Sequence, residues 1–246
     1  MTIPRLFEPG RNLRPGSSFI PENEVLHYLR RVLRLKPGDP VLLLDGGSVA
    51  WRAVLTGSDS GLGLEVERVE EGVRVAPDGR RITALVPMLK VDRHEIAIQK
   101  ATELGATSLF LYFADRSIPR PGARENARLD RYRKVAEEAC RQCDRALLPA
   151  LAMYDSLQSA VAALPEDGSR YLLSEIGVVE PLVRLAVSPG PVTLAVGPEG
   201  SFTDTERAML LAAGFVPAGL GPRVLKAETA VIAAVMAVQV AGGDMG

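Results

Sequence analysis

The sequence predicts an α/β fold in two parts: a small β-rich module at the N-terminus, then a larger domain built on a parallel sheet. From residue 81 to the end, apolar runs alternate with helix-like segments, which is typical of parallel sheets covered on both faces. Before that point, short alternating runs joined by glycine-rich turns indicate antiparallel strands. We expect the module over 1–72, a linker over 73–80 and the larger domain over 81–246.

The N-terminal module should contain a hairpin, a further strand and one helix. In "VLLLDGGSVAWRAVL" (41–55), Asp-Gly-Gly joins two apolar runs, which is a hairpin signal. "LGLEVERVE" (62–70) alternates like a strand. The segment 21–35 is expected to be a helix that starts at Pro21, and its apolar stripe consists of Val25, Leu29, Val32 and Leu33. The stretch 71–80 combines charge, glycine and proline without an apolar pattern, so we place the linker there.

The larger domain alternates strand and helix. Strands are expected at 82–89, 107–113, 170–175, 192–200 and 215–221. Helices are expected at 92–104, 127–145, 156–164, 180–187, 203–215 and 227–241. Gly105 should stop the first of these helices, and Thr203 and Glu206 have capping-box spacing. Ligands of such sheets bind beyond the carboxyl ends of the strands.

Composition excludes several classes of protein. With 246 residues, 47% of them apolar and 24% charged, the chain is typical of soluble globular proteins. It shows no charged-then-apolar leader, so we expect no secretory signal and a cytoplasmic location. The most apolar segment, 230–243, is too short to span a bilayer and should be a buried or subunit-interface helix.

No metal site is expected. Cys140 and Cys143 form a lone C-x-x-C in a helix-like stretch, and His27 and His94 lie far from them without ligand spacing. We interpret the cysteines as small side chains on a helix face, and each histidine as a surface or capping residue rather than a catalytic one.

The net charge of −1 hides two arginine-rich clusters. Residues 1–36 hold seven Lys/Arg against three acids, and residues 116–145 hold nine against five. Arginine suits phosphate oxygens and base stacking, so the clusters leave two alternatives open, solvated helix faces or an RNA-binding surface. The arginines proposed for RNA are Arg5, Arg11, Arg30, Arg31, Arg34, Arg116, Arg120 and Arg124.

Three strand ends in the last third of the chain could hold a ligand. They are "LLSE" (172–175), the stretch 196–201 and "GLGPRVLKAETA" (219–230). No P-loop and no dinucleotide glycine fingerprint is present, so a phosphate ligand is not indicated. The alternatives are ordinary tight turns, or a neutral or zwitterionic ligand held by backbone groups, with close approach provided by Gly197, Gly200, Gly219 and Gly221.

Two of these stretches together are specific. "AVGPEGSFTDTE" (195–206) followed by "GLGPRVLKAETAVIAAV" (219–235) resembles the SPOUT superfamily of S-adenosylmethionine-dependent RNA methyltransferases. Within it, the chain resembles the ribosomal RNA small subunit methyltransferase E family, which methylates N3 of a uridine in 16S rRNA. "RLF", "HYLRRVLRLKPGD", "KVDRHEIAIQKATELGA" and "RYRKVAEEACRQCDRALLPAL" match in the family's order. The chain departs from the pattern at Ser201, Lys226 and Tyr132, where the family usually has glycine, arginine and tryptophan.

The resemblance implies a trefoil-knotted C-terminal methyltransferase domain, a PUA-like N-terminal β-barrel and a homodimer that acts on 16S rRNA of the small ribosomal subunit, with S-adenosylmethionine as cofactor and no metal. The three loops would wrap the cofactor, and the expected binding residues are Leu173, Ser174, Glu175, Val196, Gly197, Pro198, Gly200, Leu220, Gly221, Val224 and Leu225.

Two mechanisms could activate N3 of the uridine. A base could remove the N3 proton, or a cation could stabilise the anionic uracil. Arg223 is the candidate cation, although it could instead shape its loop through a salt bridge. Glu199 is the candidate base and Glu175 an alternative, while Glu228 fits a charge at a helix N-terminus equally well. We favour positioning and charge stabilisation over a dedicated base.

Two other functions compete with rRNA methylation. A methyltransferase acting on transfer RNA would share the cofactor site and differ in its RNA-facing surface. A non-catalytic RNA-binding assembly factor could keep the fold, but it would have no need for the intact "GPEG" and "LGPRVLKAETA" stretches.

Overall fold

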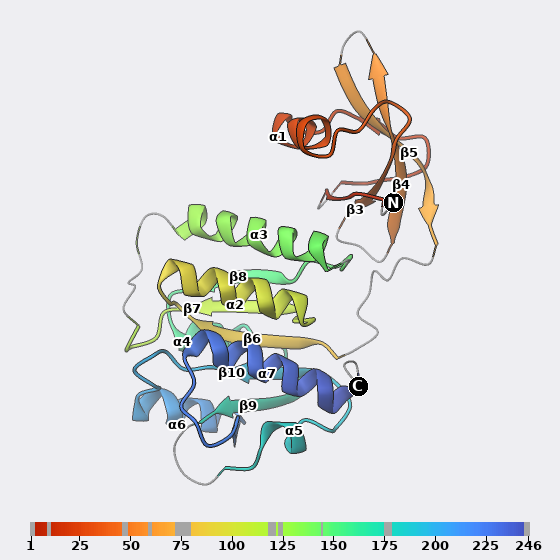
Figure 1. The fold of residues 1–246 in the computed structure, drawn as a ribbon. Helices are drawn as coiled ribbons and strands as arrows, with labels where there is room; N and C mark the ends of the chain where they lie inside the picture. The colour runs from red at the N-terminus through yellow and green to blue at the C-terminus, as the bar shows by residue number, and fades with distance from the viewer. Residues whose placement is uncertain are drawn as a thin grey trace. The chain divides into compact units, whose positions relative to one another are not determined.

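The computed structural model describes residues 3–8, 11–45, 49–58, 61–71, 80–117, 122, 125–143, 145–174 and 179–243. The chain divides into two compact units (Figure 1). Unit 1 comprises Met1–Ala76 with Asp144–Leu147, and unit 2 comprises Pro77–Cys143 with Leu148–Gly246. Of the expected linker, 73–80, only Arg80 lies among the described residues.

Unit 1 is built on a five-stranded sheet with the strand order β1-β3-β4-β5-β2. Its strands are β1 (Arg5–Phe7), β2 (Ser18–Phe19), β3 (Pro40–Leu44), β4 (Ala50–Ser58) and β5 (Gly61–Glu70). β4 pairs antiparallel with both β3 and β5, which confirms the predicted hairpin and the strand after it. Leu43, Leu55 and Leu64 form the core together with Leu29. From much later in the chain, Ala146 packs against Leu44 and Ala50.

The helix of unit 1 differs from the prediction. It consists of a short α-helix, α1 (Asn23–His27), continued by a π-helical turn over Tyr28–Val32. The π-turn holds one more residue than an α-turn, so it shifts the phase of the following side chains. Leu29 is fully buried, and Val25 and Leu33 pack on the core, all as expected, whereas Val32 is 61% exposed and Leu35 packs on the core instead.

Unit 2 contains a six-stranded sheet with the order β11-β9-β10-β6-β7-β8. Every pair in it is parallel, as the sequence predicted. Its strands are β6 (Ile82–Pro87), β7 (Ser108–Tyr112), β8 (Ala150–Tyr154), β9 (Ser169–Leu173), β10 (Val192–Ala195) and β11 (Val216–Ala218). The edge strand β8 was not expected from the sequence.

Helices cover both faces of this sheet. They are α2 (Val91–Glu103), α3 (Glu125–Gln142), α4 (Leu157–Ala162), α5 (Leu182–Leu185), α6 (Asp204–Ala212) and α7 (Ala227–Gly242). Side chains such as Ala84 and Val86 face α2, α3, α5 and α7, while their neighbour Leu85 faces α4 and α6. Figure 1 shows α2, α3 and α7 over one face. Among the described residues, no helix combines the length and apolarity that a membrane crossing requires.

Local signals place the ends of several helices. Gly105 follows α2 with a φ of 93°, which confirms it as the stop of that helix. Both Thr203 and Glu206 donate from the backbone to each other's side chains, so the predicted capping box of α6 is present. The side chain of Gln239 in α7 donates to the carbonyl of Leu104 at 2.8 Å, which ties α7 to the end of α2.

Candidate functional site

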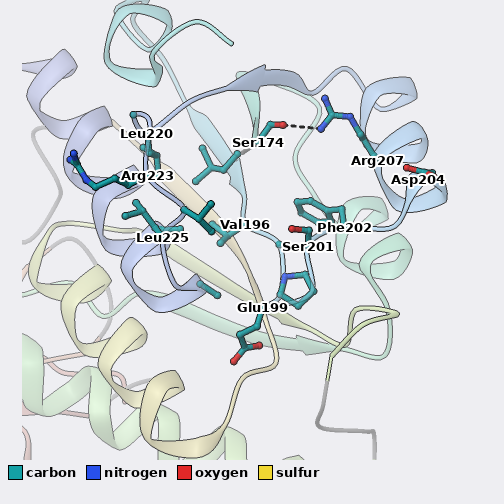
Figure 2. A pocket seen from close by; sticks show the side chains of 17 residues that line it. Ser174, Val196, Glu199, Ser201, Phe202, Asp204, Arg207, Leu220, Arg223 and Leu225 are labelled. Atoms are coloured by element: carbon teal, nitrogen blue, oxygen red, sulfur yellow. Dashed lines mark hydrogen bonds between the residues drawn. The ribbon is translucent and has the colours of Figure 1, made fainter. Parts of the chain in front are cut away.

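The three loops singled out in the sequence meet in unit 2, because β11, β9 and β10 are neighbours and end at the same edge of the sheet. They surround a cavity that is open to solvent and is lined by residues of all three loops. The cavity is lined by Leu173, Ser174, Val196, Gly197, Pro198, Glu199, Ser201, Phe202, Asp204, Arg207, Leu220, Gly221, Arg223, Val224, Leu225, Ala227 and Ala230 (Figure 2).

Most of the expected cofactor-binding residues line this cavity. Gly200 does not belong to the lining, and Glu175 lies outside the described residues. The lining also contains residues that were not expected from the sequence to bind the cofactor, and these are Ser201, Phe202, Asp204, Arg207, Ala227 and Ala230. The first four belong to the "GPEGSFTDTER" stretch, so their proximity in the sequence could have indicated them.

The third loop contacts the segment 179–182, which follows the first loop in the chain, through backbone hydrogen bonds. The amide of Gly219 donates to the carbonyl of Glu180, and the amide of Leu182 donates to the carbonyl of Gly219, both at 2.9 Å. A Cβ at Gly219 would lie 2.9 Å from Cγ2 of Val179. Only glycine therefore permits this close approach of the third loop to the segment 179–182.

The second loop is held from below by Tyr112, at the end of β7. Its hydroxyl donates to the carbonyl of Val196 at 2.5 Å. Burial, and then the carboxylate of Glu206, raise the pKa of Tyr112 well above its usual value, so the hydroxyl stays a donor. The Val196 carbonyl therefore has a defined direction before any ligand arrives.

Beyond Val196 the second loop turns sharply. The amide of Ser201 donates to the carbonyl of Pro198 at 2.9 Å, and Ser201 has a φ of 58°. Positive φ is uncommon outside glycine, and this strained serine lines the cavity. A β-carbon on Gly197 would lie 3.1 Å from the ring of Phe202, so that ring closes over the loop.

Arg116 supports the same loop. Its Nη1 donates to the carbonyl of Gly200 at 2.8 Å, and a Cβ at Gly200 would meet the Arg116 side chain at 3.2 Å. Gly200 therefore gives space to Arg116 rather than to the cavity. The sequence assigned Arg116 to RNA, and the structure adds this bond to the loop.

Glu199 is not a free carboxylate. Its Oε1 accepts from Nη1 of Arg93 at 3.0 Å, and Nε of Arg93 lies 3.7 Å from Oε1 of Glu228. Arg93 in α2 thus bridges the second loop and the first turn of α7. Arg93 could not be recognised from the sequence, because its pairing with Glu199 joins residues that are 106 positions apart.

Two arginines line the cavity without an ion pair among the described residues. Arg223 belongs to the third loop, is exposed, and follows Gly221, whose φ is 105°. Arg207 in α6 is half-buried, and its Nη1 donates to Oγ of Ser174 at 2.9 Å (Figure 2).

The other arginines proposed for RNA are mostly in unit 1. Arg30 and Arg31 lie on the π-helical turn and Arg34 follows it with a φ of 56°, and all three are exposed. Arg11 pairs with Glu8 at 3.0 Å and lies over the ring of Phe19. Arg5 belongs to β1, while Arg120 and Arg124 lie outside the described residues.

His94 is fully buried and so is not a surface residue. Its Nδ1 accepts from the amide of Leu89, and its ring stacks on Tyr132. Burial, and then the charge of Arg128, lower the pKa of His94 to about 4. Both cysteines are free thiols, Cys140 inside α3 and Cys143 just after it. Among the described residues, no group of three His, Cys, Asp or Glu side chains could hold a metal.

Comparisons with known proteins match the two parts of the chain to two domain families. A family model described as an RNA methyltransferase domain matches residues 77–239, and one described as an RNA methyltransferase PUA domain matches residues 20–65. Ribosomal RNA small subunit methyltransferase E of Mycobacterium tuberculosis is 35% identical over 92% of this chain and 87% of its own. The relative of that name from Synechocystis sp. is 33% identical over 83% of this chain and 67% of its own.

Solved structures agree. Ribosomal RNA small subunit methyltransferase E from Neisseria gonorrhoeae, bound to S-adenosyl methionine, has a TM-score of 0.87 at 28% identity and covers 100% of both chains. A putative methyltransferase from Legionella pneumophila in complex with the cofactor SAM also has a TM-score of 0.87, at 27% identity, covering 98% of this chain and 99% of its own. From these matches, the chain belongs to the ribosomal RNA small subunit methyltransferase E family.

Proposed function

We propose that this protein transfers the methyl group of S-adenosylmethionine to N3 of a uridine in 16S rRNA of the small ribosomal subunit. The observation that carries the proposal is the cavity at the ends of β9, β10 and β11. The printed names of the relatives support the ribosomal substrate, and the two solved structures support the cofactor.

The cavity suits this cofactor chemically. Apolar side chains such as Leu220 and Leu225 can cover a flat heteroaromatic ring, and the nearby backbone amides and carbonyls can bind its polar edge. The charged side chains in the lining are of both signs, as a zwitterionic ligand requires: Glu199, Asp204, Arg207 and Arg223. When bound, S-adenosylmethionine supplies an electrophilic methyl group.

The protein must also make uridine N3 nucleophilic, because neutral uracil carries a proton there. We propose that Arg223 stabilises the negative charge that develops on the base as this proton leaves. Arg223 is exposed at the cavity and makes no ion pair within the described part of the chain, which supports this role. Glu199 stays a candidate base, but its bond to Arg93 equally favours a role in holding the loop.

Variants separate the two roles. Arg223→Gln should lower the rate of methyl transfer by about 100-fold while leaving cofactor affinity within a few-fold, since it removes one charge stabiliser from the transition state. Glu199→Gln should cost much less if the carboxylate only anchors the loop. A loss of cofactor affinity in Arg223→Gln as large as its loss of rate would contradict the role of Arg223.

The function itself is tested by incubating the protein with tritiated S-adenosylmethionine and one RNA at a time: naked 16S rRNA, assembled small subunits or transfer RNA. Label at N3 of one uridine in 16S rRNA supports the proposal. Label confined to transfer RNA would support the alternative substrate, and absence of label from all three would favour an assembly factor. Arg223→Gln serves as the low-activity control.

Further features are proposed from the family resemblance. These are a trefoil knot in the methyltransferase domain over 81–246, a PUA-like β-barrel over 1–72, a linker over 73–80, a homodimer and a cytoplasmic location. The family-model matches to 20–65 and 77–239 support the two domains. Exposed apolar side chains on the neighbouring helices α2 and α7, including Ile96 and Met236, support a subunit contact. Light scattering of the purified chain would measure its mass in solution.

A further inference from the structure

Arg207 is a cation at the wall of the cavity, and it has no counter-ion within the part of the chain that the structure describes. It is half-buried, its guanidinium donates to the neutral hydroxyl of Ser174, and it forms no ion pair among the described residues. A guanidinium that is partly removed from water needs an anion or several hydrogen bonds to offset its desolvation. Arg207 therefore favours a negatively charged group in the space beside it.

The other charges of the cavity do not meet this need. Glu199 is held by Arg93, and Figure 2 shows its carboxylate directed away from Arg207. Asp204 lies three residues before Arg207 on the same helix, and α-helical residues at this spacing are neighbours. No ion pair joins Asp204 to Arg207 within the described part of the chain.

We propose that Arg207, held by Ser174, binds the α-carboxylate of the cofactor's amino-acid end, and that Asp204 binds its α-ammonium. This inference rests on the proposed function, since it assigns one end of the S-adenosylmethionine site. A carboxylate matches the planar guanidinium of Arg207, and Asp204 supplies the opposite charge about one helical turn away. Together the two residues would bind both charges of the zwitterion.

A phosphate of the RNA is the competing anion for Arg207. Figure 2 shows Arg223 and Arg207 on opposite sides of the cavity, with Val196 and Leu220 between them. Arg223 is exposed whereas Arg207 is half-buried and tied to a strand end. A half-buried, pre-positioned arginine suits a small ligand that enters the cavity, and an exposed arginine suits the polymer outside it.

The test compares two ligands that differ only at the amino-acid end. S-adenosylhomocysteine carries the zwitterion, and 5′-methylthioadenosine keeps the nucleoside and sulfur but lacks it. Calorimetry on the full-length chain should show that Arg207→Gln weakens S-adenosylhomocysteine about 10- to 100-fold, the range for a lost charge-assisted bond. Binding of 5′-methylthioadenosine should change less than about twofold, and this also reports an intact cavity.

Further variants and a third ligand separate the contribution of the carboxylate from that of the ammonium. Arg207→Lys should recover part of the lost affinity, and Ser174→Ala should weaken S-adenosylhomocysteine less than Arg207→Gln does. Decarboxylated S-adenosylmethionine keeps the ammonium of the amino-acid end and lacks the carboxylate. Its affinity should therefore fall in Asp204→Asn and stay unchanged in Arg207→Gln.

Several results would overturn the inference. Equal losses for both ligands in Arg207→Gln would mean that Arg207 only supports the loop. Unchanged affinity for both ligands with weaker rRNA binding would assign Arg207 to RNA. In both cases, binding of the two ligands by the wild-type chain would still support the proposed cofactor site. If the wild-type chain binds neither ligand, the proposed function fails and this inference fails with it.

Discussion

At the scale of single residues, Ser201 stores backbone strain beside the cavity. Its φ of 58° costs a residue with a β-carbon about 1 kcal/mol relative to glycine. The free energy of unfolding of Ser201→Gly, measured in urea, should therefore be about 1 kcal/mol higher than that of Ser201→Ala.

The control for Ser201 is Ser159, inside α4. There both substitutions remove the same capping bonds, and the order should reverse because alanine is the better helix former by about 1 kcal/mol. Equal stability of Ser201→Gly and Ser201→Ala would show that the left-handed conformation carries no strain in solution.

His94 makes stability depend on pH. Burial, and then Arg128, lower its folded-state pKa to about 4 from 6.5, so the folded protein keeps His94 neutral while the unfolded chain binds a proton. Its contribution to stability is complete above pH 6.5 and is lost as the pH falls towards 4. The loss should reach about 3 kcal/mol, at up to about 1.4 kcal/mol per pH unit.

Denaturation of His94→Met between pH 7 and 4 tests this, because methionine removes the proton site and keeps an apolar side chain there. The variant should lose stability less steeply than the wild type, and His27→Gln, at an exposed histidine, should follow the wild type. Parallel curves for His94→Met and the wild type would contradict the lowered pKa.

At the scale of elements, the start of α6 depends on one buried carboxylate. Glu206 accepts from the amide of Thr203 at 2.9 Å and from the amide of Asp115 at 3.0 Å. Glu206→Ala removes the acceptor of both amides and should lower the free energy of unfolding by about 2 to 4 kcal/mol. Ser159→Ala, which opens the capping box of α4, should cost about 1 kcal/mol.

Equal costs for these two variants in urea denaturation would mean that the bond from Asp115 adds nothing. A difference would locate the extra stability in the contact between the end of β7 and α6. That contact lies next to the second loop of the cavity, so Glu206 also helps to place the loop.

Elements with a strong local signal could be predicted from the sequence. The apolar runs gave β6, β7, β9 and β10, and the capping box of α6 was visible in Thr203 and Glu206. β8 (Ala150–Tyr154) was missed because its alanine, leucine and methionine favour helices, and only pairing with β7 makes them a strand. Val32 was misplaced because a π-turn has no clear sequence signal.

In the candidate site, too, some features could be predicted from the sequence and others could not. Its loops were predictable, since parallel strands end at a common edge and the loops contain glycine and polar residues. The partners of its charges were not predictable. Arg93 reaches Glu199, and Arg207 reaches Ser174, only after the sheet has brought distant segments together.

At the scale of the whole molecule, RNA binding should depend on salt. The exposed arginines of the π-helical turn and its end, Arg30, Arg31 and Arg34, are proposed to contact phosphates, and each contact releases counterions. Replacing all three by glutamine should reduce the log–log salt slope of 16S rRNA binding by about 2, at roughly 0.7 to 0.9 per phosphate.

The matched control replaces three arginines of α3 that already pair with carboxylates, Arg131, Arg133 and Arg141. The net charge changes by the same amount, but these cations have partners within the protein, so the slope should change by less than about 1. Fluorescence anisotropy with labelled 16S rRNA fragments at several salt concentrations measures both slopes. If the two triple variants change the slope equally, RNA binding follows net charge and the surface of unit 1 has no special part in it.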